Sequence, residues 1–180
     1  MKTSTQIILA ASAILFSACQ LNTPNLNAGI DHRTERFEDI ITQKTFNDCK
    51  QEGHTFDRQA SEQNRQELYL ASANKFLSCE SNLGQNAHLV DIQDRMKTYA
   101  LGIQNKVKGG DVNGASVALQ KFKSYFSGMD LIYENGSSFS ASYTALLGAN
   151  DDANLLRLSS INAKPQVKKE VKRIWHWRTN

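Results

Sequence analysis

The most regular pattern of apolar and polar positions lies in the middle of the chain, over residues 87–108. Apolar side chains recur there at steps of three and four residues, which is the spacing of one face of an α-helix. This stripe consists of Leu89, Ile92, Met96, Tyr99, Ile103 and Val107. Gly109 and Gly110 follow directly, and glycine favours the end of a helix. The pattern therefore predicts an amphipathic helix whose apolar face belongs to a core.

A second stripe with the same spacing follows over residues 112–127. It consists of Val112, Ala115, Leu119, Phe122, Phe126 and Met129, and Asp111 precedes it as a predicted N-cap. Two amphipathic helices joined by a short glycine turn form an αα-hairpin. The stretch from Tyr99 to Leu119 resembles a single tetratricopeptide repeat. Because no second copy follows, we expect a lone hairpin over about residues 87–127 with tetratricopeptide-like packing.

Two weaker helical patterns precede this hairpin. Residues 34–52 form the first, and the second runs from Asp57 or Ser61 to about Glu80. The first is expected to turn Phe37, Ile40, Ile41 and Cys49 inward, and the second Leu68, Tyr69, Ala73, Phe76 and Cys79. Glycines such as Gly53 are interpreted as the breaks between helical segments.

After Gly128 the pattern becomes shorter and less regular. Residues 131–133 predict an extended loop, and Ser137 or Ser138 is a predicted cap for a short helix. A further short helix is expected after Asp151 or Asp152, and a last one from Pro165. The predicted inward residues are Phe139, Tyr143, Leu146 and Leu147, then Leu155, Leu156 and Leu158, then Val167, Val171, Ile174 and Trp175. Together these patterns predict an all-α domain over residues 31–180, a compact bundle of five to seven helices.

The amino-terminal segment has the pattern of an export signal. Residues 7–18 are apolar except for two serines, and this stretch is shorter than the ~20 residues that span a bilayer. Ordinary signal peptidase cleavage after Ala18 would place the bulky Phe16 at a position that requires a small residue. A second small pair at Ala11 and Ala13 would leave only a few apolar residues in front.

Leu15-Phe16-Ser17-Ala18-Cys19 instead resembles the bacterial lipobox, in which the cysteine receives lipid. The resemblance implies a signal peptide over residues 1–18, a lipidated Cys19 and a flexible tether over residues 19–30. Gln20 stands where lipoproteins kept at the inner membrane have Asp, which implies the outer membrane, with the domain facing the periplasm. A soluble periplasmic protein with an incidental Cys19 is the alternative.

Two cysteines, Cys49 and Cys79, remain after Cys19, and export places them in an oxidising compartment. They predict one disulfide that closes a loop of some 30 residues and contributes roughly 3–4 kcal/mol. Free buried thiols or an intermolecular bridge are the alternatives. If helices 34–52 and 61–80 formed a tight hairpin, the two cysteines would lie ~30 Å apart. The bridge therefore requires either that residues 51–64 form a return connection or that one helix is shorter, and we expect an irregular segment there.

Residues that could carry catalysis are few. The four histidines are scattered without the spacing of a metal site, and no nucleophile elbow or phosphate-binding glycine loop is present. We therefore expect no cofactor, no metal and no enzymatic activity. A cell-wall hydrolase that uses two carboxylates is the alternative.

The carboxy-terminal segment is strongly basic. Residues 164–178 hold six basic side chains and one acid. Their net charge, 6 − 1 = +5, exceeds the net charge of +3 of the whole chain. One interpretation is a helix docked on the core with solvated lysines. The other is a contact surface for phospholipid, lipopolysaccharide or an acidic partner protein. That surface would consist of Lys168, Lys169, Lys172, Arg173, Trp175, Trp177 and Arg178.

These features favour a non-enzymatic accessory of the cell envelope, held at the outer membrane, that binds or pilots a partner protein. In its overall build the chain resembles the pilotins and assembly factors of secretion, conjugation or pilus machines, an analogy of architecture alone. A hydrolase or its modulator, and a binder of anionic membrane surface, are the alternatives. Nucleic acid is not an expected partner of an anchored envelope protein.

Overall fold

The computed structural model describes residues 26–148 and 161–179, and these ranges are almost entirely helical. The elements are α1 (Leu26–Gln63), α2 (Gln66–Ser81), the 3₁₀ helix η1 (Gly84–Leu89), α3 (Ile92–Lys108), α4 (Val112–Tyr125), α5 (Phe139–Leu147) and α7 (Pro165–Thr179). The described part contains an isolated β-bridge, between Ile132 and Ser138, and no longer strand. The predicted all-α class is confirmed. The short helix expected around Leu155 to Leu158 lies outside the described residues.

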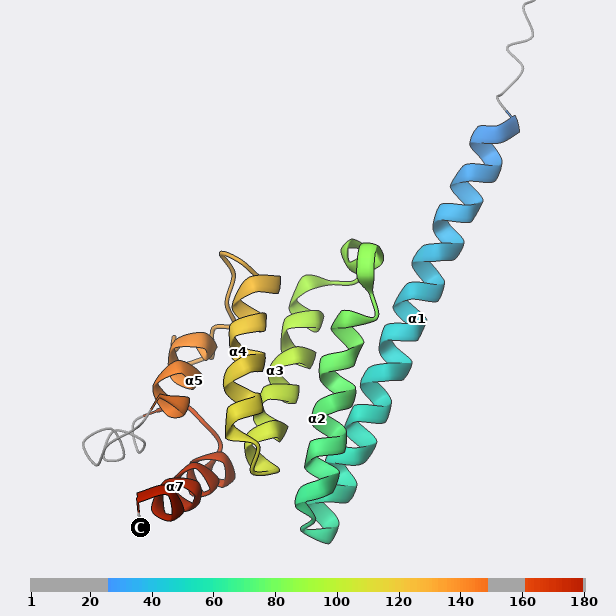
Figure 1. The fold of residues 1–180 in the computed structure, drawn as a ribbon. Coiled ribbons are helices and arrows are strands. Elements are labelled where there is room, and N and C mark those ends of the chain that lie inside the picture. The colour runs from blue at the N-terminus through green and yellow to red at the C-terminus, as the bar shows by residue number, and fades with distance from the viewer. Residues whose placement is uncertain (1–25, 149–160, 180) are drawn as a thin grey trace, which may run out of the picture.

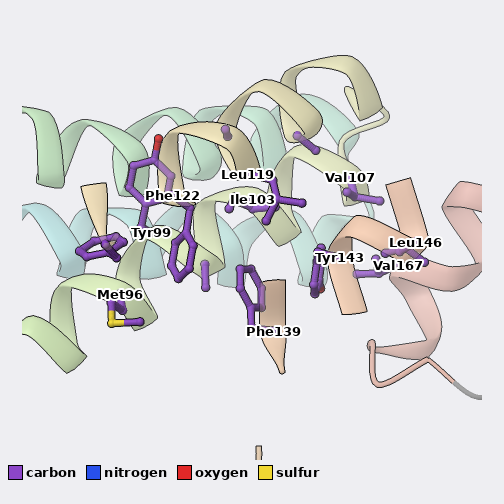
Figure 2. Close-up of a cluster of buried hydrophobic side chains, with 14 of the residues drawn as sticks. Met96, Tyr99, Ile103, Val107, Leu119, Phe122, Phe139, Tyr143, Leu146 and Val167 are labelled. Carbon is purple, nitrogen blue, oxygen red and sulfur yellow. The ribbon is translucent and has the colours of Figure 1, made fainter. Parts of the chain in front are cut away.

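The first four α-helices stand side by side in chain order, as Figure 1 shows, with α5 and α7 at the far end of the row from α1. Each helix therefore packs mainly on its neighbours in sequence, and α7 returns to contact α3 and α5. The main core lies between α3, α4, α5 and α7. Figure 2 shows its side chains, among them Met96, Tyr99, Ile103, Val107, Leu119, Phe122, Phe139, Tyr143, Leu146 and Val167.

The α3–α4 hairpin follows the predicted pattern closely. Asp111 caps α4, and its Oδ1 accepts a hydrogen bond of 2.8 Å from the Gly114 amide. The start of α3 differs, because Asp91 caps the helix at Ile92 and the preceding residues form η1 instead. Met129 is exposed, since α4 ends before it at Tyr125. The likeness of this hairpin to a tetratricopeptide repeat stays a prediction.

The predicted break over residues 51–64 is wrong. Helix α1 continues without interruption to Gln63, and the chain turns at Asn64, whose φ of 51° is left-handed. Cys49 and Cys79 are equidistant in sequence from Asn64, so an antiparallel hairpin with its turn there places them opposite each other. Their Cα atoms are 5.7 Å apart and the predicted disulfide is formed. The geometric conflict came from the expected turn position, which was too close to Cys49.

Gly53 lies inside α1 and does not end a helix. A Cβ atom at this position would be 2.6 Å from the ring of Phe76 on α2, so the absence of a side chain lets the two helices approach closely. The Gly53 carbonyl accepts a hydrogen bond of 2.8 Å from the Ser72 hydroxyl, and Asn105 of α3 donates to the same hydroxyl. This buried chain of polar groups links α1, α2 and α3.

A buried ion pair joins α2 to α3. The Arg95 guanidinium donates through Nε to Glu80 Oε2 at 3.0 Å and through Nη2 to Oε1. Its Nη1 donates to the Ala87 carbonyl of η1, and the guanidinium carbon lies 5.5 Å from the ring centre of Phe126. Both charged side chains are almost fully removed from solvent. One arginine thus connects four segments of the chain.

Removal of the disulfide by the double substitution C49A/C79A is expected to lower the free energy of unfolding by about 3–4 kcal/mol, because the unfolded chain regains the entropy of the open loop. Urea denaturation followed by circular dichroism measures this change. Wild-type protein under reducing conditions is the control and should lose a similar amount. Equal stability of the oxidised wild type and the double variant would contradict a stabilising role for the bridge.

Substitution E80A is expected to cost about 3–5 kcal/mol, since it leaves the Arg95 charge buried without its carboxylate. The double substitution E80M/R95M removes both charges at similar volume and should recover much of that loss. The two variants are compared with wild type in the same urea titration. A double variant no more stable than E80A would show that packing, and not the unpaired charge, causes the loss.

Substitution D111A is expected to cost ~1 kcal/mol through loss of the N-cap. Burial alone would raise the pKa of Asp111, but hydrogen bonds from Lys106 and the Gly114 amide hold it below its ordinary value of 3.8. A lowered folded-state pKa means that the ionised cap stabilises the fold at neutral pH and loses this effect as the pH falls through that lowered value. The difference in the free energy of unfolding between wild type and D111A should therefore shrink as the pH is lowered through the acidic range. A difference that stays constant with pH would rule out the ionised cap.

Candidate binding surfaces

Helix α7 is docked on the core and exposed on its other side. Val167 and Val171 are fully buried, and Ile174 is half-buried beside them. The opposite side exposes Lys169, Lys172, Arg173, His176 and Trp177. We call these five residues the α7 basic face. The docking of α7 agrees with the first of the two interpretations of this segment, and a contact role for its exposed side stays a prediction.

The remaining residues of the predicted surface lie apart from this face or outside the description. Lys168 is half-buried at the edge of the docked side of the helix. Trp175 and Arg178 belong to α7, but their side chains are outside the described part of the structure. Trp177 is 73% exposed, which is unusual for the largest apolar side chain.

A cleft of about 370 Å³ separates α7 from the first turn of α2 and the end of α3. Its lining consists of Asn64, Gln66, Tyr69, Lys108, Gln166, Lys169, Glu170 and Arg173. Arg173 donates to Glu170 at 2.9 Å, and this hydrogen bond raises the pKa of the guanidinium. Lys108 pairs with Asp57 at 3.0 Å and lies 4.8 Å from the ring centre of Tyr69. The cleft is thus a polar, mainly basic hollow beside the α7 basic face.

A second exposed surface lies on α1 and was not expected. Phe37, Ile40 and Ile41 were predicted to face the core, but they are 62%, 65% and 46% exposed. The reason is the unequal length of the two hairpin arms, because α1 has 38 residues and α2 has only 16. Residues 26–41 extend beyond the end of α2 and project from the body in Figure 1. Phe37 and Ile40 are therefore largely open to solvent, while Ile41 lies at the border with the body.

The projecting part of α1 begins where a small cavity marks the end of the body. This cavity, of about 130 Å³, lies beside the disulfide and is lined by Ile41, Phe46, Leu83 and their neighbours. Phe46 and Thr42 are buried there, and the Gln43 side chain donates to the Leu89 carbonyl of η1 at 3.3 Å. The sequence does hold a signal for this overhang. If Cys49 and Cys79 are paired across a hairpin, the turn lies at their midpoint, Asn64, and the arm before the turn is then longer than the arm after it.

The described residues show no grouping typical of a metal centre, since no three metal-ligating side chains converge among them. None of the described helices is both long enough and apolar enough to cross a membrane. Cys19, the predicted lipidation site, lies outside the described residues, as does most of the predicted tether. Helix α1 begins at Leu26, inside the segment predicted to be that tether.

Comparison of the chain with models of protein families, with curated proteins and with solved structures found no match.

Proposed function

We propose that this protein is an outer-membrane lipoprotein, anchored through Cys19, that acts as a non-enzymatic accessory and binds a partner protein with the α7 basic face. The observation that carries this proposal is the state of α7: its apolar side is docked, while Trp177 and three cationic side chains remain exposed together. A docked helix that presents tryptophan and arginine has the composition of an interface centre.

The chemistry of this face favours an acidic partner. Lys169, Lys172 and Arg173 lie on consecutive turns, and one of the three, Arg173, pairs with an acid of its own helix. The adjoining cleft adds the polar ends of Asn64 and Gln66, while the charge of its Lys108 is already paired with Asp57. An acidic surface would gain attraction from these groups and burial of the exposed indole.

The position of α7 also supports this proposal. Helix α7, which carries the basic face, lies at the far end of the row of helices from α1, as Figure 1 shows for the two helices. An anchor at Cys19 would hold the α1 end near the bilayer, which leaves the α7 end accessible to other proteins of the envelope. Binding and anchoring would thus use separate parts of the molecule.

The test is a comparison of two charge-matched variants of the full-length lipidated protein. Variant K169E/K172E/W177A changes the α7 basic face, and K97E/K121E reverses two exposed lysines on α3 and α4 as the control. Proteins crosslinked to each in intact envelopes are identified and quantified by mass spectrometry. We expect a partner that wild type and control recover equally and that the α7 variant recovers about tenfold less or worse.

Equal recovery by all three proteins would overturn the role of the α7 basic face. Binding of the unlipidated chain to anionic vesicles, lost in the α7 variant, without any such partner would instead favour the membrane-surface alternative. Added salt should weaken an acidic partner's binding, because exposed charges are screened.

A further inference from the structure

The projecting part of α1 separates its charges by sign. At about 100° per residue, Arg33, Arg36, Phe37, Ile40 and Ile41 fall within an arc of about 140°. The acids of the same segment whose side chains the structure describes, Glu35, Glu38 and Asp39, fall within a separate arc of about 100° on the other side. The apolar side chains therefore share their face with the arginines. We call Arg33, Arg36, Phe37, Ile40 and Ile41 the α1 overhang face.

The same side of α1 changes from apolar to polar where the helix begins to pack on the rest of the domain. Past Ile41 the outward positions are Lys44, Asp48, Gln51, Thr55 and Gln59, all polar. Lys44 and Asp48 form an ion pair of 2.5 Å there. The outermost helix of a row requires such a polar outer side to remain soluble in water. The apolar residues are thus confined to the overhang, so the helix is not apolar along its whole outer side.

An apolar face with flanking arginines is typical of a helix that lies in a membrane interface. The apolar side chains enter the boundary between headgroups and acyl chains, while the guanidinium groups pair with phosphates. The acids on the other side of the helix would remain in water. The five residues of the overhang face thus have the distribution that an anionic lipid surface requires.

The predicted anchor places the overhang within reach of such a surface. Seven residue steps separate Cys19 from Leu26, and a fully extended chain of this length spans about 24 Å. Phe37 lies only about 17 Å further along the helix. Acyl chains on Cys19 would therefore hold the overhang at a high effective concentration next to the bilayer.

We propose that the α1 overhang face lies on the surface of the bilayer that holds the Cys19 anchor. This inference depends on the lipid anchor of the proposed function, but not on the role of α7. This contact would set the orientation of the whole domain. If α1 lies on the membrane, the row of helices packed on its other side extends away from the membrane. The α7 basic face would then point into the periplasm.

The test uses the full-length lipidated protein in vesicles of phosphatidylethanolamine and phosphatidylglycerol with brominated acyl chains, which quench nearby tryptophan. Variant F37W places the probe on the overhang face, and E35W places it on the opposite, acidic side as the control. The parent chain, whose only tryptophans are Trp175 and Trp177, gives the background. We expect quenching at position 37 to exceed that at position 35 several-fold.

Addition of R33E/R36E to F37W should reduce this quenching in anionic vesicles and have a smaller effect in phosphatidylcholine vesicles. Equal quenching at positions 35 and 37, whether strong or weak, would overturn the proposal. If the fluorescence of the F37W tryptophan depends on the density of protein in the vesicles and not on bromine, a second copy of the chain covers the face, and the proposal is wrong. Mass spectrometry of Cys19 separates the two proposals: an acylated protein without selective quenching refutes the orientation only, whereas an unacylated one refutes the anchor as well.

Discussion

The register of the α1–α2 hairpin is the constraint on which the rest of the structure depends. The left-handed turn at Asn64 sets which residues of the two helices face each other, and the Cys49–Cys79 bridge fixes that choice covalently. Gly53 then meets the ring of Phe76, and Ser72 meets the Gly53 carbonyl. Asn105 of α3 donates to the same serine, so the register of the hairpin also fixes the position of α3, which forms part of the main core.

The elements that the sequence predicts well are those whose signals are local. The apolar stripe through Met96, Tyr99 and Ile103 gives α3, and Asp111 and Ser138 cap the helices that they were expected to cap. Helix α7 likewise follows from Pro165 at its start. A stripe at helical spacing and a capping side chain each act within a few residues, so tertiary context has little opportunity to override them.

The parts that the sequence does not predict depend on contacts between distant residues. Gly53 destabilises a helix by ~1 kcal/mol in isolation, and the reason for a glycine there, the ring of Phe76 against it, lies on another helix. Phe37 and Ile40 have the spacing of core residues, yet a core requires a second helix, and α2 ends too early to supply one. The basic side of α7 was predictable from charge alone, whereas the overhang of α1 required the position of the turn.

The position of the disulfide also determines how the molecule bears mechanical force. A pull on the amino-terminal end of α1 would separate it from its neighbours one turn at a time, beginning where the helix leaves the body. Cys49 lies near that point, so separation stops at a covalent bond and the load passes through sulfur to Cys79 on α2. The residues between the two cysteines, including the turn at Asn64, then carry none of the tension. A protein attached to a moving membrane at one end and to a partner at the other would keep this hairpin intact under load.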